Sequence, residues 1–304
     1  MVDAGSIAPE ACPRMTLNNG TTIPVVGFGT FKNREGIKAL VKSAILEHGY
    51  RHIDTARVYE NEAEIGEALE ECVAAGVRRE DLYITTKLWM SGYHDIEGTC
   101  RESLRLLRLD YLDLYMIHWM ILPLDWESED WRPKSPPFHV IWEQMEQLVA
   151  KGLVKSIAVS NCTIPMMINL LASCTIKPVI NQIELNPYMN QADVLRFHKK
   201  WNIALEAYAT IGAEGSTVLA DPLLNEIAAA HGCTSAQVAI AWAAQRGTIP
   251  LVKTARAERL AENINAVKVQ LTEEEMAKVD SLNKGVRKFD PITWAGQKNM
   301  PYFM

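Results

Sequence analysis

The sequence lacks a basic excess, a long apolar run and a secretory signal. Its 304 residues hold 31 Lys and Arg against 37 Asp and Glu, a net charge of -6, so nucleic acid is not an expected partner. No apolar run approaches the ~20 residues of a membrane-spanning helix. Residues 1–10 lack the basic start and apolar stretch of a signal peptide. We therefore expect neither nucleic-acid nor membrane partners.

Metal-ligand and disulfide patterns are missing as well. His48 and His52 stand four residues apart, but Gly49 ends the helix between them, so no shared metal site is expected. The cysteines contain no CxxC pair, which predicts free thiols in a reducing compartment, the cytoplasm. They are Cys12, Cys72, Cys100, Cys162, Cys174 and Cys233.

The glycine fingerprint of a Rossmann dinucleotide site is also absent, because Gly27-Phe28-Gly29 has Lys32 at the third glycine position. An anionic dinucleotide would need another cationic site. Lys253, Thr254, Arg256 and Arg259 follow the last predicted strand, where α/β barrels commonly bind phosphate. So many cations favour a 2′-phosphate over a diphosphate alone. A basic helix face in solvent is the alternative.

What the sequence does contain is a regular alternation of short apolar strands and amphipathic helices. Before it, two β runs at Met15–Leu17 and Ile23–Val26 flank Asn18-Asn19-Gly20, a strong hairpin signal. The predicted strands are Val26–Gly29, His52–Asp54, Tyr83–Lys87, Leu112–His118, Val154–Ser160, Val179–Glu184, Ala204–Tyr208 and Thr248–Lys253. Helices are predicted at Glu35–Glu47, Glu62–Ala75, Asp95–Arg108, Val140–Lys151, Asp193–Trp201, Asp221–His231 and Ser235–Arg246. This pattern predicts an α/β protein with one domain over residues 1–304, a closed (β/α)8 TIM barrel whose bottom the hairpin caps.

Chemically active side chains stand at or just beyond the ends of three predicted strands. Asp54 ends the second strand with Tyr59 just beyond, Lys87 ends the third and His118 the fourth. Singly, each has an ordinary explanation, such as an N-cap, a solvated charge or a core histidine. Together they suggest a buried Lys–Asp pair beside a Tyr whose pKa the ammonium lowers. Such a group suits proton transfer to a developing alkoxide, as in carbonyl reduction by hydride.

A different chemistry is open at the sixth and seventh strand ends. Glu184 and Glu206 are the acids near these ends, and Glu206 alternates with Tyr208 on one face of its strand. Paired carboxylates would make the protein a barrel hydrolase, which is a rival hypothesis.

Five motifs connect the chain to a known family. They are Tyr-Arg-His-Ile-Asp-Thr-Ala…Tyr-Glu-Asn-Glu (50–62), Ile-Thr-Thr-Lys-Leu-Trp (84–89), Leu-Asp-Leu-Tyr-Met-Ile-His-Trp (112–119), Ala-Val-Ser-Asn (158–161) and Asn-Gln-Ile-Glu-Leu-Asn-Pro-Tyr (181–188). With them the sequence resembles an aldo-keto reductase of the aldose/aldehyde reductase type over roughly residues 16–283. The resemblance implies a (β/α)8 barrel that binds NADPH, with NADH less favoured, across its mouth without a Rossmann motif.

The resemblance also implies residue roles. In the tetrad Asp54, Tyr59, Lys87 and His118, Tyr59 would be the general acid. Lys87, paired with Asp54, would lower the pKa of Tyr59, and His118 would orient the carbonyl. Cofactor-binding positions would be Thr30, Asp54, Ser160, Asn161, Gln182, Tyr208, Ile211, Lys253, Thr254, Arg259, Glu262 and Asn263. Substrate-binding positions would be Phe31, Tyr59, Trp89, His118 and Trp119.

The sequence departs from the family pattern after the seventh strand, where Tyr208-Ala209-Thr210-Ile211-Gly212 replaces Tyr-Ser-Pro-Leu-Gly. Because residues 212–221 are also few for a loop over the pyrophosphate, we hypothesise a less tightly held cofactor. Expected substrates are aldoses, short hydroxyaldehydes and aromatic aldehydes, with ketones, prostaglandin-like and steroid compounds left open. Segment 126–137 and the tail around Trp294 would decide among them. The family default is a monomer, and the alternative function is a non-catalytic NADP(H)-binding sensor or accessory subunit.

Overall fold

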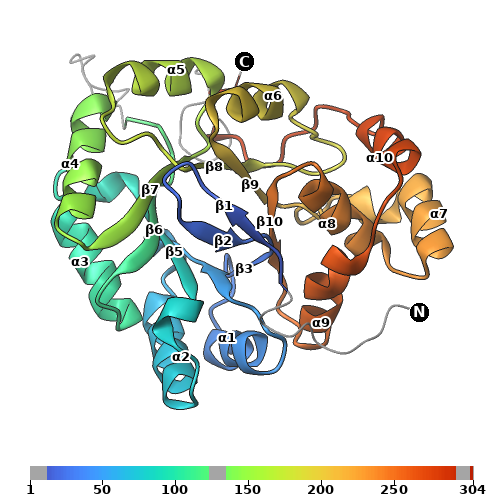
Figure 1. Cartoon of the computed structure of the whole chain (residues 1–304), viewed down its shortest axis with the longest axis horizontal. Coiled ribbons are helices and arrows are strands. Elements are labelled where there is room, and N and C mark those ends of the chain that lie inside the picture. The colour runs from blue at the N-terminus through green and yellow to red at the C-terminus, as the bar shows by residue number, and fades with distance from the viewer. Residues whose placement is uncertain (1–11, 123–134, 292–301, 304) are drawn as a thin grey trace.

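The computed structural model describes residues 12–122, 135–291 and 302–303. Within these residues, eight parallel strands close into a barrel in the order β10-β3-β4-β5-β6-β7-β8-β9 (Figure 1). The strands are β3 (Gly27–Gly29), β4 (His52–Asp54), β5 (Tyr83–Leu88), β6 (Leu112–Ile117), β7 (Val154–Ser160), β8 (Ile180–Glu184), β9 (Ala204–Tyr208) and β10 (Ile249–Lys253). The predicted (β/α)8 barrel is confirmed, and each predicted strand lies within one residue of its observed bounds.

Helices surround the barrel (Figure 1). They are α1 (Ile37–Leu46), α2 (Glu62–Ala74), α3 (Ile96–Leu107), α4 (Phe138–Ala150), α5 (Ile164–Ser173), α6 (Ala192–Trp201), α7 (Pro222–His231), α8 (Ser235–Gln245), α9 (Glu258–Asn265) and α10 (Glu273–Asp280). Local sequence sets several boundaries: Asp95 caps α3 by accepting from the Gly98 N–H at 2.9 Å, and Thr234 with Gln237 forms a capping box on α8. The sequence prediction gave no bounds for α5, α9 or α10.

The strands are buried on both faces, as parallel strands covered by helices require. All six residues of β5 are buried. Thr86 points outward, where its hydroxyl donates to Glu62 of α2 at 2.7 Å. Its neighbour Lys87 points into the barrel toward Asp54 of β4. The twofold alternation of a strand therefore selects which polar side chains enter the barrel.

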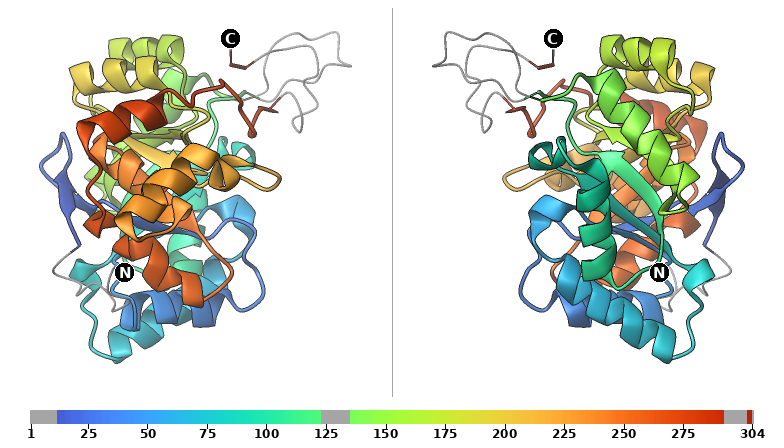
Figure 2. Two further views of the ribbon diagram at one scale, coloured as in Figure 1. Left: turned by 90° about the vertical axis from the view of Figure 1, so that its right-hand side faces the viewer. Right: turned by 90° about the vertical axis from the view of Figure 1, so that its left-hand side faces the viewer.

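The hairpin closes one end of the barrel. Strands β1 (Arg14–Thr16) and β2 (Thr22–Pro24) pair antiparallel, and Gly20 takes the left-handed conformation (φ 83°) that the turn needs. The Asn19 side-chain amide donates to the Ser156 hydroxyl of β7 at 2.9 Å. The hairpin lies at one end of the barrel and the chain that follows α10 at the other (Figure 2). The predicted bottom cap is confirmed.

Three further features concern the described residues only. All six cysteines are free thiols. No helix in the described ranges has the length and apolar character to cross a membrane. No group of three or more His, Cys, Asp and Glu side chains there is arranged to hold a metal ion.

Candidate active site

The four predicted catalytic residues meet at the carboxyl ends of three neighbouring strands. Asp54 is the last residue of β4, and Lys87 is the last but one of β5. His118 follows β6 directly, and Tyr59 ends the short 3-10 turn η2 (Arg57–Tyr59) beyond β4. Because parallel strands present their carboxyl ends on one rim, these side chains share the mouth opposite the hairpin.

Lys87 and Asp54 form a buried ion pair. The Lys87 Nζ lies 2.7 Å from Asp54 Oδ1 and donates to the Thr55 carbonyl at 2.9 Å. The lysine side chain is fully buried. Burial alone lowers the pKa of Lys87, but the charges of Asp54 and Tyr59 outweigh it and raise the pKa above its usual value. Lys87 is therefore a cation at neutral pH, at the floor of the mouth.

Tyr59 stands over this cation, half-buried. Its ring centre lies 5.1 Å from Lys87 Nζ, 5.7 Å from the centre of the His118 ring and 5.0 Å from that of Phe31. Burial raises the pKa of Tyr59 above 10, and the Lys87 charge offsets only part of this rise. The predicted net lowering of the pKa is not met in this structure. The sign of the Lys87 contribution agrees with the prediction.

His118 is a neutral imidazole. Burial and the nearby Lys87 charge hold its pKa well below 6.5. Its Nδ1 has no hydrogen-bond partner within the described part of the chain. The ring packs edge-on against Trp89, with centres 5.2 Å apart. A neutral imidazole of this kind can hydrogen-bond a carbonyl oxygen but does not supply the proton at neutral pH.

Four of the predicted cofactor-binding residues, Ser160, Asn161, Gln182 and Tyr208, lie at the next strand ends. The Ser160 hydroxyl donates to the Gln182 carbonyl at 2.9 Å. Asn161, in the left-handed conformation (φ 56°), accepts from the Tyr208 hydroxyl at 2.7 Å and donates to the His118 carbonyl at 3.0 Å. The structure brings these predicted residues together beside the tetrad and fixes each by hydrogen bonds to its neighbours.

The predicted phosphate-binding residues lie one strand further round. Lys253 ends β10 and is exposed. Thr254 is buried, and its hydroxyl accepts a hydrogen bond from the backbone N–H of Arg256 at 2.9 Å. Lys253, Arg256 and Arg259 make no ion pair with any carboxylate of the described ranges. Thr30 is buried at the end of β3, and its hydroxyl donates to the Asp54 carbonyl at 3.0 Å.

The remaining cofactor positions flank this cationic rim. Glu262 of α9 accepts from the Thr234 hydroxyl at 2.7 Å, and Asn263 beside it is buried. Ile211 packs half-buried against the main core from the loop after β9. Ala209 in the same loop has a left-handed backbone (φ 53°), which is uncommon for alanine.

Aromatic side chains form the predicted substrate side, with a contribution from the tail that the sequence did not locate. Phe31 is 39% exposed at the rim, and Trp89 is half-buried. Phe289 packs against Tyr208 and Phe31, with ring centres 5.4 and 6.2 Å apart. Of segment 126–137 and the tail around Trp294, which the sequence predicted to decide the substrate, residues 126–134 and Trp294 itself lie outside the described residues.

Trp119 is covered by the tail. Its ring contacts those of Tyr302 and Phe303, with centres 5.8 and 6.2 Å apart, and it is 5% exposed. The Tyr302 hydroxyl donates to the Asn161 carbonyl at 2.9 Å. The aromatic residues of the tail thus pack on the mouth of the barrel. The sequence did not predict which face of the barrel they contact.

Two buried glutamates belong to the site in ways the sequence did not show. Glu184 accepts from the backbone N–H groups of Lys288 and Phe289 at 2.9–3.0 Å and so anchors the tail. Glu206 is fully buried and accepts from the Gln182 amide at 2.5 Å. Both carboxyl groups are engaged within the protein, so the pairing that a glycoside-type hydrolase requires has no structural support. The alternation of Glu206 with Tyr208 was the signal that placed it inside the barrel.

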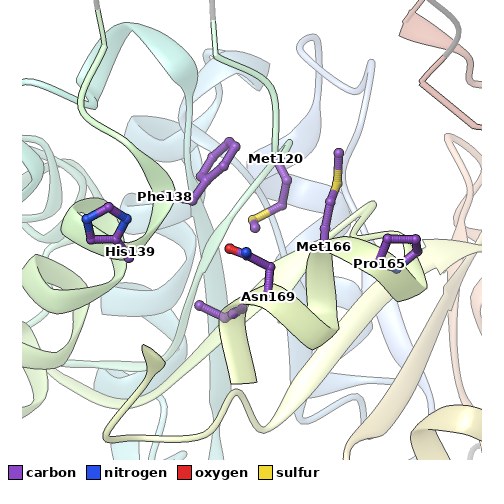
Figure 3. A pocket seen from close by; sticks show the side chains of 7 residues that line it. Met120, Phe138, His139, Pro165, Met166 and Asn169 are labelled. Carbon is purple, nitrogen blue, oxygen red and sulfur yellow. The ribbon is translucent and has the colours of Figure 1, made fainter. Parts of the chain in front are cut away.

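A separate cavity of about 250 Å³ lies away from the tetrad, between α4 and α5 (Figure 3). It is lined by Met120, Phe138, His139, Pro165, Met166, Asn169 and Leu170. It holds none of the tetrad, and its lining is mainly apolar. The chemistry therefore belongs to the strand ends, where the charged and titratable groups converge.

Comparison with known proteins agrees with this geometry. The family model "Aldo/keto reductase family" matches residues 17–284. The chain belongs to the aldo/keto reductase family. It is 36% identical to aldo-keto reductase family 1 member A1 of Gallus gallus over 95% of this chain and 94% of the relative. It is 38% identical to aldose reductase B of Dictyostelium discoideum, over 90% and 93%.

A solved structure shows the same likeness in three dimensions. The aldose reductase from Schistosoma japonicum has a TM-score of 0.87 and 36% identity, covering 95% of this chain and 98% of that one. The protein is thus an oxidoreductase of a family that acts on carbonyl and alcohol groups and generally uses NAD(P)H.

Proposed function

We propose that the protein reduces aldehydes to alcohols by hydride transfer from NADPH, with Tyr59 as the general acid. The observation that supports this most strongly is the arrangement of Tyr59 between the Lys87–Asp54 ion pair and a neutral His118. No group of side chains arranged to hold a metal ion accompanies them in the described ranges. A proton donor over a fixed cation suits the formation of an alcohol from a carbonyl group.

The cofactor preference rests on the cations after β10. Lys253, Arg256 and Arg259 lack carboxylate partners within the described part of the chain, so their charges are available to a ligand. Lys253, Thr254 and Arg259 would hold the 2′-phosphate that distinguishes NADPH from NADH. Gln182, Ser160 and Asn161 would hold the carboxamide, and Tyr208 would pack against the ring. When bound, the nicotinamide supplies the hydride.

The chain's own residues supply the proton and the orientation. His118 would direct the carbonyl oxygen by a hydrogen bond from its imidazole, since the ring is neutral and its Nδ1 is unpartnered in the described residues. Tyr59 would pass its phenolic proton to that oxygen as the alkoxide forms. Lys87 would stabilise the phenolate left behind, and Asp54 holds Lys87 in place at 2.7 Å.

The substrate class follows from the rim. Phe31, Trp89 and Phe289 present flat apolar surfaces near Tyr59. Such a site would favour aromatic and short aldehydes, including aldoses and hydroxyaldehydes, and it leaves room for ketones. Aldehydes stay the first choice because the tail residues Tyr302 and Phe303, which cover Trp119, would leave less room for a bulky ketone.

The test is an absorbance assay of NADPH oxidation with a panel of aldehydes, ketones and aldoses, repeated with NADH. We expect turnover with NADPH and at least one aldehyde, and weaker turnover with NADH. The variant Tyr59→Phe keeps the ring but removes the proton, and should reduce kcat by about 10²–10⁴-fold. NADPH binding, followed by tryptophan fluorescence, should be unchanged in this variant.

The same data separate the alternative function. A sensor or accessory subunit would bind NADPH, with no turnover of any carbonyl by the unmodified protein. Turnover that Tyr59→Phe leaves intact would instead refute Tyr59 as the acid while preserving the reductase assignment.

A further inference from the structure

Glu206 has a position in the barrel that the catalytic tetrad does not explain. It lies on β9 two residues before Tyr208, with its side chain fully buried. Its Oε2 accepts from Gln182 Nε2 at 2.5 Å. Its Oε1 accepts no hydrogen bond within the described residues and lies 3.3 Å from His52 Nε2, which is also 3.5 Å from the Thr85 hydroxyl. A buried carboxyl group is costly unless its hydrogen bonds are complete, so this contact set needs an explanation.

Gln182 connects this carboxyl group to the catalytic ion pair. Its Nε2 donates to Glu206 Oε2 and also to Asp54 Oδ2, the latter at 2.9 Å. Both hydrogens of the amide are thereby used, and its oxygen remains as an acceptor. Asp54 in turn holds Lys87. A continuous polar chain runs through the barrel interior from His52 through Glu206, Gln182 and Asp54 to Lys87.

The contacts of this chain fit a Glu206 that carries a proton. Burial lowers the pKa of His52 to about 3, so His52 is neutral and its Nε2 can accept a hydrogen bond. A protonated Glu206 would donate from Oε1 to that nitrogen while Oε2 still accepts from Gln182. Burial and the Asp54 charge raise the pKa of Glu206 to about 8. The chain then holds one anion, Asp54, for its one cation, Lys87.

Groups from each packed element decide how Glu206 titrates. On β8 it meets the uncharged Gln182, and on β10 the residue paired with it is Ile249. The titratable groups that act on it or feel its charge are His52 and Asp54 of β4, Tyr83 and Lys87 of β5, and Tyr59 of η2.

We propose that Glu206 is a positioning residue of the proposed reductase, which orients the Gln182 amide and Asp54 and, when it ionises, weakens Tyr59 as the acid. The inference rests on the proposed function. In its neutral form Glu206 fixes the Gln182 amide, whose oxygen remains available as an acceptor. In its ionised form it adds a second negative charge to the group around Lys87. That charge raises the pKa of Tyr59, so proton transfer to the carbonyl oxygen becomes slower.

The test compares two substitutions at this position. Glu206→Gln retains an oxygen that accepts from Gln182 and an NH₂ that donates to His52, and therefore mimics the protonated acid at every pH. Glu206→Leu removes both hydrogen bonds. The matched control is Glu62→Gln, another buried glutamate, which contacts Thr86 on the outer face of the barrel wall.

The first readout is kcat for aldehyde reduction at saturating NADPH from about pH 6 to about pH 10. The unmodified protein and Glu62→Gln should lose about 3- to 10-fold in kcat as the pH rises through about 8. Glu206→Gln should keep its low-pH rate across this range. Glu206→Leu should lose about 10-fold or more at every pH and bind NADPH more weakly, because Gln182 is no longer fixed.

A second readout needs no cofactor. The infrared carbonyl band of a protonated carboxylic acid should disappear near pH 8 in the unmodified protein and in Glu62→Gln, and that component should be missing from Glu206→Gln. A pH profile shared by the unmodified protein and Glu206→Gln, with equal infrared titrations, would overturn the inference. A failure of the unmodified protein to oxidise NADPH with any carbonyl would overturn the proposed function, and the infrared titration would still decide the protonation of Glu206.

Discussion

The interior chain and the cationic rim use charge in opposite ways. In the interior, Lys87 and Asp54 are buried and hydrogen-bonded, so water and salt have little access to them. At the rim, Lys253 and Arg259 are exposed and have no carboxylate partners among the described residues. Buried charges respond to protonation and to loss of a partner, whereas exposed charges respond to ionic strength. The interior should therefore be sensitive to pH and the rim to salt.

Removing the interior cation should have the largest effect. Lys87→Met leaves the Asp54 carboxylate buried with the Gln182 amide as its remaining side-chain donor among the described residues. We expect the free energy of unfolding to fall by about 3–5 kcal/mol. The kcat should fall by about 10²–10⁴-fold because the phenolate of Tyr59, the proposed acid, would lose its counter-charge. Urea unfolding and the NADPH assay measure the two effects.

A surface lysine provides the control for this substitution. Lys151→Met removes an exposed ion pair with Glu97 and should leave both the midpoint of unfolding and kcat unchanged. If Lys87→Met and Lys151→Met changed the midpoint of unfolding and kcat equally, the buried ion pair would contribute no more than an exposed one.

The pH dependence of stability tests the interior a second way. The pKa of Glu206 is about 8 in the folded protein against 4.5 ordinarily, so the folded state binds this proton more tightly. The stability that this proton provides is complete below pH 4.5 and is lost as the pH rises through about 8. Glu206→Gln lacks this loss. Relative to the unmodified protein, its free energy of unfolding should rise by on the order of 5 kcal/mol between pH 4.5 and about 8.

Urea unfolding at several pH values measures this difference. Added salt should change it little, because Glu206 is fully buried. Stability curves for the two proteins that run parallel from pH 4.5 to 8 would show that Glu206 titrates normally, and that the interior chain does not perturb it.

At the rim the expected effect is smaller and depends on salt. Arg259→Ala should raise the Kd for NADPH by about 10- to 100-fold, because the proposed charge-assisted contact to the 2′-phosphate would be lost. The Kd for NADH should stay the same. The difference between the two cofactors should shrink as salt is added. Tryptophan fluorescence titrations at low and high salt measure all of these constants.

Lys155→Met is the charge-matched control for the rim. Lys155 lies near the start of β7, with its ammonium 3.3 Å from Asp113, at the end of the barrel that the hairpin closes. It should change neither Kd. Equal weakening of NADPH and NADH by Arg259→Ala would show that the arginine binds a part common to both cofactors.

The sequence predicted where the interior side chains lie better than it predicted the hydrogen bonds among them. The places of Asp54, Lys87 and His118 followed from strand ends, because parallel strands in a barrel bring those ends to one rim. The link from Gln182 to both Asp54 and Glu206 did not follow. Alternation along β9 tells which face Glu206 takes, but not which side chain from another strand it meets.

Two other features were beyond sequence reasoning for physical reasons. The net pKa of Tyr59 depends on burial competing with the Lys87 charge, and the sequence showed only the charge. Phe289 docks against Tyr208 because the Glu184 carboxylate accepts hydrogen bonds from the backbone N–H groups of Lys288 and Phe289. Such a contact to main-chain N–H groups leaves no residue pattern in the tail.

The backbone has an unfavourable conformation where strand β9 leaves the barrel. Ala209 has φ 53°, a left-handed conformation that is unfavourable for a residue with a Cβ, and its carbonyl accepts from the Gly212 N–H at 2.8 Å. Ala209→Gly relieves this strain but gives the unfolded chain more freedom. The free energy of unfolding should therefore rise by no more than about 1 kcal/mol. Ala207→Gly, two residues earlier in the extended and buried part of β9, should instead lower it. Urea unfolding of the two variants side by side measures the difference. Equal destabilisation by the two substitutions would mean that the bend after Tyr208 is not strained. Alanine would then fit position 209 as well as it fits position 207.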